Sequence, residues 1–147
     1  TPSVHSTQSF LTETRAGVYA LGDAQQLELG GMDMNDVALS VVTTVVSARG
    51  QTVVVDAGSK IMGADKASWA SGHGRVLGHA DARIVAMSEH HATVVFPDSD
   101  PAPRCGDIIQ VIPNHVCNAV NLVDSVLVKR ARKPAQVWPV AARGKNS

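Results

Sequence analysis

A histidine and a cysteine stand two positions apart in segment 113–117, which reads PNHVC. If the backbone there is extended, side chains at positions i and i+2 lie on one face, so His115 and Cys117 converge. Imidazole and thiolate are both good zinc ligands, and two protein ligands leave coordination positions open for water or substrate. The spacing is compatible with an open metal site, but on its own it favours the alternative of a packed histidine beside a buried thiol, because such pairs arise by chance and a free cysteine is often a small buried apolar residue.

Other histidines of the chain are weaker candidates for a third metal ligand. Residues 89–91 read Glu-His-His, and adjacent side chains of a strand point to opposite faces, so at most one histidine would face the site. The alternative is an exposed turn histidine beside a packed one. His73 and His79 flank glycine-rich turns and are predicted to lie at the surface.

Two charged residues follow a predicted strand in the segment 56–60, which reads DAGSK. Lys60 after a glycine turn resembles an imine-forming lysine, but nothing in the neighbouring sequence would lower its pKa, so a solvated side chain is favoured. Asp56 would either cap the turn or orient a neighbouring ligand, and the structural role is favoured.

The composition points to one domain with its own core. The chain has 147 residues, of which 44% are apolar, and a formal net charge of zero. Balanced charge and 3% aromatic residues argue against nucleic acid or a membrane as a partner. The basic residues at 129–133 predict a solvated turn. With no secretion signal and no apolar run long enough for a membrane span, Cys105 and Cys117 are predicted to be free thiols in the cytoplasm.

β-Branched residues and regularly spaced turn signals predict a mainly β fold, a barrel or a sandwich with few short helices. The predicted strands are 17–21, 38–47, 52–56, 75–77, 82–87, 92–96, 108–112, 125–129 and 136–140. Strand 38–47 is apolar on both faces, which predicts a central position. One or two helical turns are predicted within each of 22–30 and 118–122.

Several segments, in order along nearly the whole chain, resemble the C-terminal domain of the D-serine dehydratase and D-threonine aldolase family. These are pyridoxal-phosphate enzymes of the alanine-racemase-like fold type. The matching segments are 15–19 (RAGVY), 22–26 (GDAQQ), 56–60 (DAGSK), 88–91 (SEHH), 113–117 (PNHVC) and 138–144 (WPVAARG). His90 departs from the pattern, because the family usually has glutamate there, and Ala92 replaces the usual glycine.

The resemblance implies a two-part enzyme of which this chain is the second part. Residues 1–14 would be the end of a barrel's phosphate loop and a linker, 15–143 a metal-carrying β domain, and 144–147 a disordered tail. Thr1 would contact the cofactor phosphate. The Schiff-base lysine would lie upstream in the N-terminal barrel, so no catalytic residue is assigned in this segment, and this segment alone is expected to be inactive.

The resemblance also implies that His115 and Cys117 are the metal ligands. Cysteine at the second position is typical of the zinc-using dehydratases, whereas aspartate there is typical of aldolases that use manganese. The metal would act as a Lewis acid on the hydroxyl of a β-hydroxy D-amino acid, either in D-serine dehydration or in D-threonine aldol cleavage.

Two hypotheses about the domain follow from these patterns. In the lyase hypothesis, the domain serves an enzyme that is a homodimer, and His115 and Cys117 face a shared cleft. In the alternative, the β domain is non-catalytic, serves dimerisation and binds no metal, and both side chains are enclosed in apolar core.

Overall fold

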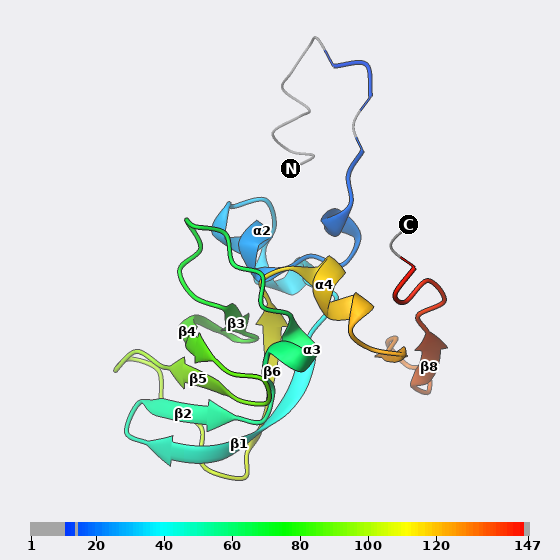
Figure 1. The fold of residues 1–147 in the computed structure, drawn as a ribbon. Coiled ribbons are helices and arrows are strands. Elements are labelled where there is room, and N and C mark those ends of the chain that lie inside the picture. The colour runs from blue at the N-terminus through cyan, green and yellow to red at the C-terminus, as the bar shows by residue number, and fades with distance from the viewer. Residues whose placement is uncertain (1–10, 14, 146–147) are drawn as a thin grey trace.

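A computed structural model of the chain describes residues 11–13 and 15–145. Its centre is a closed antiparallel barrel in which the strands follow the order β1-β2-β5-β4-β3-β6, with β6 pairing back to β1 (Figure 1). This confirms the mainly β, barrel-like fold with short helices. The strands are β1 (Val41–Arg49), β2 (Thr52–Val55), β3 (Gly74–Val76), β4 (His79–Met87), β5 (Ala92–Val95) and β6 (Ile108–Pro113).

The barrel interior is filled by side chains, as expected for a closed sheet of so few strands. Alternate residues of the strands point inward, so that Val53 and Val55 of β2 are fully buried whereas Val54 between them is only half-buried. Ile84, Val94 and Phe96 belong to the same cluster. The interior is therefore a packed core and offers no room for a ligand.

The prediction that strand 38–47 is buried on both faces is wrong. β1 lies in the barrel wall, where Thr43 and Val45 are buried but Val42 and Val46 are exposed. An antiparallel barrel covers only one face of each strand, so an apolar residue on the outer face of β1 stays accessible unless another element covers it.

Short helices gather on one side of the barrel (Figure 1). They are η1 (Val18–Ala20), α2 (Ala24–Glu28), η2 (Met34–Asp36), α3 (Ser59–Met62) and α4 (Val116–Asn121). The predicted helical turns within 22–30 and 118–122 correspond to α2 and α4, whereas α3 and η2 were not predicted. The strand predicted at 17–21 is wrong, because the amides of Leu21 and Gly22 both donate to the carbonyl of Val18 and form a 3₁₀ turn.

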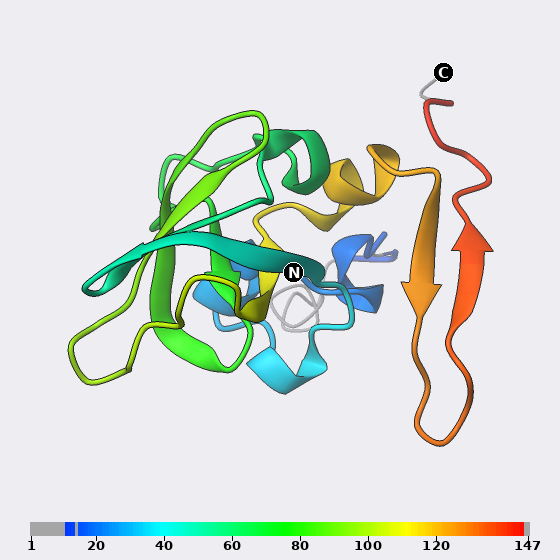
Figure 2. The same ribbon diagram turned by 90° about the horizontal axis from the view of Figure 1, so that it is seen from below.

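A separate hairpin, formed by β7 (Ser125–Val128) and β8 (Gln136–Pro139), stands beside the barrel and shares no strand with it (Figure 2). The basic residues at 129–133 lie in the loop that joins these two strands. All of them are exposed. The Arg130 guanidinium lies 5.1 Å from the ring centre of Trp138. The interpretation of this basic run as a solvated turn is thus confirmed.

Thr1, the residue expected to contact a cofactor phosphate, lies outside the described residues, as do 146 and 147. Gly144 is described, and its amide donates to Asn121 Oδ1 at 2.8 Å. Among the described helices, none combines the length and apolarity that a membrane crossing requires.

Candidate functional site

The segment that carries His115 and Cys117 is a strand-to-helix junction, so the extended geometry assumed from the sequence is wrong. β6 ends at Pro113, His115 is still extended with φ −133° and ψ 105°, and α4 begins at Val116. Cys117 therefore lies in the first turn of the helix. The Cys117 side chain thus does not follow the strand rule that places residues i and i+2 on the same face, and its direction relative to His115 depends on how α4 leaves the strand.

This junction is anchored on both sides by buried polar groups. Asn114 is 3% exposed, and its side-chain amide donates to the carbonyl of Gly72 at 2.9 Å. The amide of Val116 donates to the buried carboxylate of Asp23 at 3.3 Å. Since Asp23 also accepts from the amide of Gln26 at 2.9 Å, one carboxylate caps α2 and holds the start of α4.

His115 has one ring nitrogen engaged, and no hydrogen bond to the other is found among the described residues. Its Nδ1 lies 2.7 Å from a carboxylate oxygen of Asp65, and the two side chains are 38% and 50% exposed. With Nδ1–H as the donor to Asp65, the lone pair is on Nε2, which is the arrangement seen in metal-ligating histidines. The free imidazole nitrogen and the exposed thiol of Cys117 form a donor set that fits zinc.

His115 and Cys117 are not enclosed in the core, which contradicts the packed arrangement required by the alternative hypothesis. Neither side chain lines the cavity between η2 and the β3–β4 turn or the groove between β1 and the segment from α4 to β7. The two side chains lie on an open surface. Any cleft at this place requires a further covering element.

The described residues do not contain a group of three histidine, cysteine or carboxylate side chains close enough to hold a metal. His90 and His91, considered as third ligands, are both exposed and lie in the turn between β4 and β5. The ring of His90 lies 3.4 Å from Lys60 Nζ, and Lys60 also pairs with Glu89 at 2.9 Å. Lys60 is thus part of an exposed charge cluster.

That cluster is built around a close backbone contact. The amides of Ser59 and Lys60 at the start of α3 donate to the carbonyls of Ser88 and Glu89, at 2.9 and 3.1 Å. A Cβ on Gly58 would overlap the backbone carbonyl of Glu89, so only glycine fits there without a shift of the backbone. The segments 56–60 and 88–91 are therefore bound to each other and support α3.

Asp56 has the structural role that the sequence favoured. Its carboxylate accepts from the Thr43 hydroxyl at 2.6 Å and from the Thr44 amide at 2.8 Å. The bond from Thr43, followed by the bond from Thr44, lowers the pKa of Asp56 below its ordinary value. This carboxylate joins the end of β2 to β1.

The surface placement predicted for His73 and His79 is wrong in part. Each is half-buried, and His79 Nδ1 lies 2.7 Å from Asp100 while its ring packs edge-on against Phe96. The Nδ1 atom of His73 is buried without a partner among the described residues. Burial, together with the nearby charge of Lys66, lowers the pKa of His73.

Helix α2 is fixed to the barrel by a partly buried ion pair between Glu28 and the buried Arg75. Arg75 is 4% exposed, and the Glu28 carboxylate also accepts from the amide of Ser71 at 2.9 Å. Burial raises the pKa of Glu28, but the bonds from Ser71 and Arg75 outweigh it and lower the pKa overall. Because Asp23 caps this same helix, the ion pair also supports the junction at His115.

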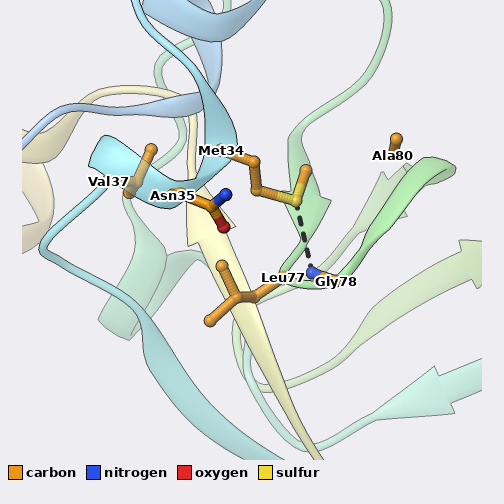
Figure 3. A pocket seen from close by; sticks show the side chains of 6 residues that line it. All are labelled: Met34, Asn35, Val37, Leu77, Gly78 and Ala80. Carbon is orange, nitrogen blue, oxygen red and sulfur yellow. Dashed lines mark hydrogen bonds between the residues drawn. The ribbon is translucent and has the colours of Figure 1, made fainter.

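Two pockets are lined by other residues, and the second of them borders α4. A cavity of about 380 Å³ between η2 and the β3–β4 turn is lined by Met34, Leu77 and their neighbours, without any ionisable side chain (Figure 3). The amide of Gly78 donates to the sulfur of Met34 across it. A second groove of about 490 Å³ runs between the start of β1 and the segment from α4 to β7, and its lining is mostly apolar.

Two carboxylates of the site, Asp65 and Asp23, were not predicted from the sequence. Asp65 is 50 positions from His115 and Asp23 is 93 positions from Val116. Asp23 lies in the GDAQQ segment that carries the resemblance, and its position before a helical stretch could have indicated a cap. No local signal indicates Asp65.

A family model described as "Putative serine dehydratase domain" matches residues 38–129. An uncharacterized protein of Mycobacterium tuberculosis (strain ATCC 25618 / H37Rv) is 56% identical over 131 residues, which cover 86% of this chain and 98% of that protein. The 3-hydroxy-D-aspartate aldolase of Paracoccus denitrificans (strain Pd 1222) is 30% identical over 149 residues, covering 96% of this chain and 37% of that enzyme. The chain thus spans a little over a third of the enzyme's length.

Solved structures share the fold. The D-threonine aldolase from Filomicrobium marinum has a TM-score of 0.72 and 27% identity, covering 89% of this chain and 36% of that chain. An ala racemase-like protein from Idiomarina loihiensis has a TM-score of 0.74 and 24% identity, with 89% and 39% covered. The D-threo-3-hydroxyaspartate dehydratase from Delftia sp. HT23 is also similar, with a TM-score of 0.74 and 24% identity, as are two structures of an enzyme of the same name, a histidine-to-alanine variant and a cysteine-to-alanine variant in the metal-free form.

Proposed function

The chain belongs to the serine dehydratase domain family, and from that premise we propose that it is the metal-bearing C-terminal domain of a pyridoxal-phosphate-dependent lyase acting on β-hydroxy D-amino acids. Named enzymes among its relatives share this substrate class, since they act on D-serine, D-threonine or 3-hydroxy-D-aspartate. The proposal covers both dehydration and aldol cleavage.

One observation carries the proposal: His115 Nδ1 lies 2.7 Å from the Asp65 carboxylate, which leaves Nε2 to act as the ligating nitrogen, and the exposed thiol of Cys117 follows two residues later in the first turn of α4. The histidine and cysteine substituted in the two dehydratase variants are likewise separated by a single residue, and the cysteine variant is in the metal-free form. A thiolate is a soft ligand, which favours zinc over manganese. A bound metal would supply Lewis-acid stabilisation of the charge that develops on the substrate hydroxyl.

The chain's own residues would orient this site. The buried groups around Asn114 and Val116 fix the junction, and the open surface around it would become a cleft when an N-terminal barrel covers it. That barrel would bind the pyridoxal phosphate and supply the Schiff-base lysine, in the same chain or in a partner chain. We extend the proposal to a homodimer in the cytoplasm, where the free thiol of Cys117 persists as a ligand.

The first experiment measures metal content and Zn²⁺ affinity of the purified chain and of its Cys117→Ala variant. We expect about one zinc per chain in the wild type and its loss in the variant, because a single imidazole binds zinc weakly. Cys105→Ala is the matched control, since Cys105 is the other exposed free cysteine and lies in a distant turn. It should bind zinc as the wild type does.

A second experiment repeats the titration with the purified barrel domain of a relative present and assays D-serine and D-threonine. Zinc-dependent activity that Cys117→Ala abolishes and Cys105→Ala preserves is the expected result. Failure of the chain to bind zinc both alone and with the barrel would contradict the metal-bearing role and favour a domain that serves dimerisation only.

A further inference from the structure

The loop between α3 and β3 is fixed at both ends to the segment that carries His115. At its start, Gly63 has φ +77° and ψ 160°, and a Cβ there would lie 3.0 Å from the side chain of Asn118 in α4. At its end, the carbonyl of Gly72 accepts from Asn114, the residue before His115. The position of this loop relative to α4 is therefore determined by close contacts at both ends.

Asp65 lies in this loop two residues after Gly63, and its carboxylate lies 2.7 Å from His115 Nδ1. No other ion pair involves Asp65 among the described residues, although Lys66 follows it directly. Because both side chains are about half exposed, the pair contributes little to folding stability. Its effect is instead on the orientation and tautomer of the imidazole.

We propose that Asp65 is the positioning residue of the site: its carboxylate holds the His115 ring in the Nδ1–H tautomer and directs the free Nε2 toward the metal shared with Cys117. This role of Asp65 rests on the proposed metal-bearing function of the domain. A carboxylate that accepts from a ligating histidine fixes the ring and raises the basicity of the ligating nitrogen. Without it, the neutral imidazole distributes its proton between both nitrogens and turns about its side-chain bonds.

The chain contains a matched control. His79 and Asp100 form a second pair with the same 2.7 Å separation between Nδ1 and a carboxylate oxygen, packed on Phe96 far along the chain from Cys117. Removing the Asp100 carboxylate takes away the same type of hydrogen bond without touching the site. An effect on zinc binding that appears in the Asp65 variant but not in the Asp100 variant is therefore due to the contact between Asp65 and His115.

The test uses the purified 147-residue chain with Zn²⁺ alone as the probe, and the variants Asp65→Ala, Asp65→Asn and Asp100→Ala. We expect Zn²⁺ affinity to fall about 10- to 100-fold in Asp65→Ala, as found when such partners of metal-ligating histidines are removed. Asp65→Asn should lose less, because its amide oxygen can still accept from Nδ1–H. Asp100→Ala should retain the wild-type affinity, and melting temperatures should confirm that all variants fold.

A second readout needs no metal. Nitrogen-15 chemical shifts of the His115 ring, recorded at pH about 8.5 where imidazoles are neutral, report which nitrogen carries the proton. We expect the Nδ1–H form in the wild type and a shift toward Nε2–H in Asp65→Ala. An unchanged tautomer in Asp65→Ala would overturn the proposal, as would unchanged Zn²⁺ affinity in a wild type that binds zinc. A wild type with the Nδ1–H form but no zinc would contradict the proposed function and leave the orienting role of Asp65 supported.

Discussion

Arg75 is a buried cation whose charge is matched by Glu28. Removing this pair tests how much it contributes to the attachment of α2 to the barrel. Replacing Glu28 with glutamine leaves the buried guanidinium without its counter-charge, and because the Glu28 side chain is itself 22% exposed, we expect a loss of about 1–3 kcal/mol of folding free energy. Urea unfolding at neutral pH measures this. The control is Glu89→Gln, whose carboxylate pairs with Lys60 at an exposed site and should contribute less than about 1 kcal/mol.

The same pair gives a pH dependence with a defined sign. The pKa of Glu28 is lower in the folded protein than its ordinary value of 4.5, so the folded state binds this proton less readily than the unfolded chain. Its stabilisation is complete above pH 4.5 and is lost as the pH falls through the lowered folded pKa. Glu28→Gln should lack this part of the acid dependence. If the acid limbs of wild type and variant had the same slope, ionised Glu28 would not be a source of folding stability.

At the residue scale, the sequence could propose a pair of ligands but not the groups that orient them. His115 and Cys117 are neighbours along the chain, so their residue types and the family resemblance were enough to single them out, and their role as ligands stays a prediction. Asp65 and Asp23 reach the junction only through tertiary contacts, and a carboxylate in a loop carries no local sign of its partner. The extended geometry failed because Asp23 accepts the amide of Val116, which favours a helix start there.

Gly63 tests whether the loop after α3 positions the site. Its backbone conformation is almost restricted to glycine, so we expect Gly63→Ala to cost roughly 1–3 kcal/mol of folding free energy. Because the new Cβ would meet Asn118, the loop should also move away from α4 and weaken Zn²⁺ binding. Urea unfolding and zinc titration measure the two effects.

Gly17→Ala is the control for this substitution. Gly17 has φ −101°, and a Cβ there would have no neighbouring atom within 4 Å among the described residues. It should leave both stability and zinc affinity close to wild type. Equal behaviour of the two variants would show that the loop does not depend on the contact with α4.

At the scale of elements, β-branched runs predicted the strands well, because a strand buried on one face needs only such residues and a turn at each end. The segment 17–21 has only one β-branched residue, Val18, and the carbonyl of Val18 closes a local turn instead of pairing with another strand. Helix α3 was missed because four residues carry too little periodicity to be detected.

The whole molecule combines a closed barrel with an open hairpin, and the two should differ in local stability. All barrel strands have two partners, whereas β7 and β8 have only each other. Leu127 and Val137 face each other in the hairpin and are 64% and 69% exposed. Isolated two-stranded sheets are marginal in water, so the amides of β7 and β8 should exchange with solvent much faster than those of β2 and β5.

Hydrogen exchange of the purified chain, followed by mass spectrometry, checks this difference. Adding the barrel domain of a relative should slow exchange in the hairpin if that domain covers it. Equal protection of the hairpin and the barrel in the isolated chain would mean that β7 and β8 are held by the barrel more firmly than their exposure indicates.

The exposed position of Cys117 in the first turn of α4 has an evolutionary consequence. An exposed side chain can be exchanged with little effect on folding, so under the proposed function a mutation at this position would change the ligand chemistry and leave the barrel intact. A carboxylate in place of the thiolate would favour harder ions. Descendants of one ancestral domain could thus adapt to the metals available in different habitats through a single codon.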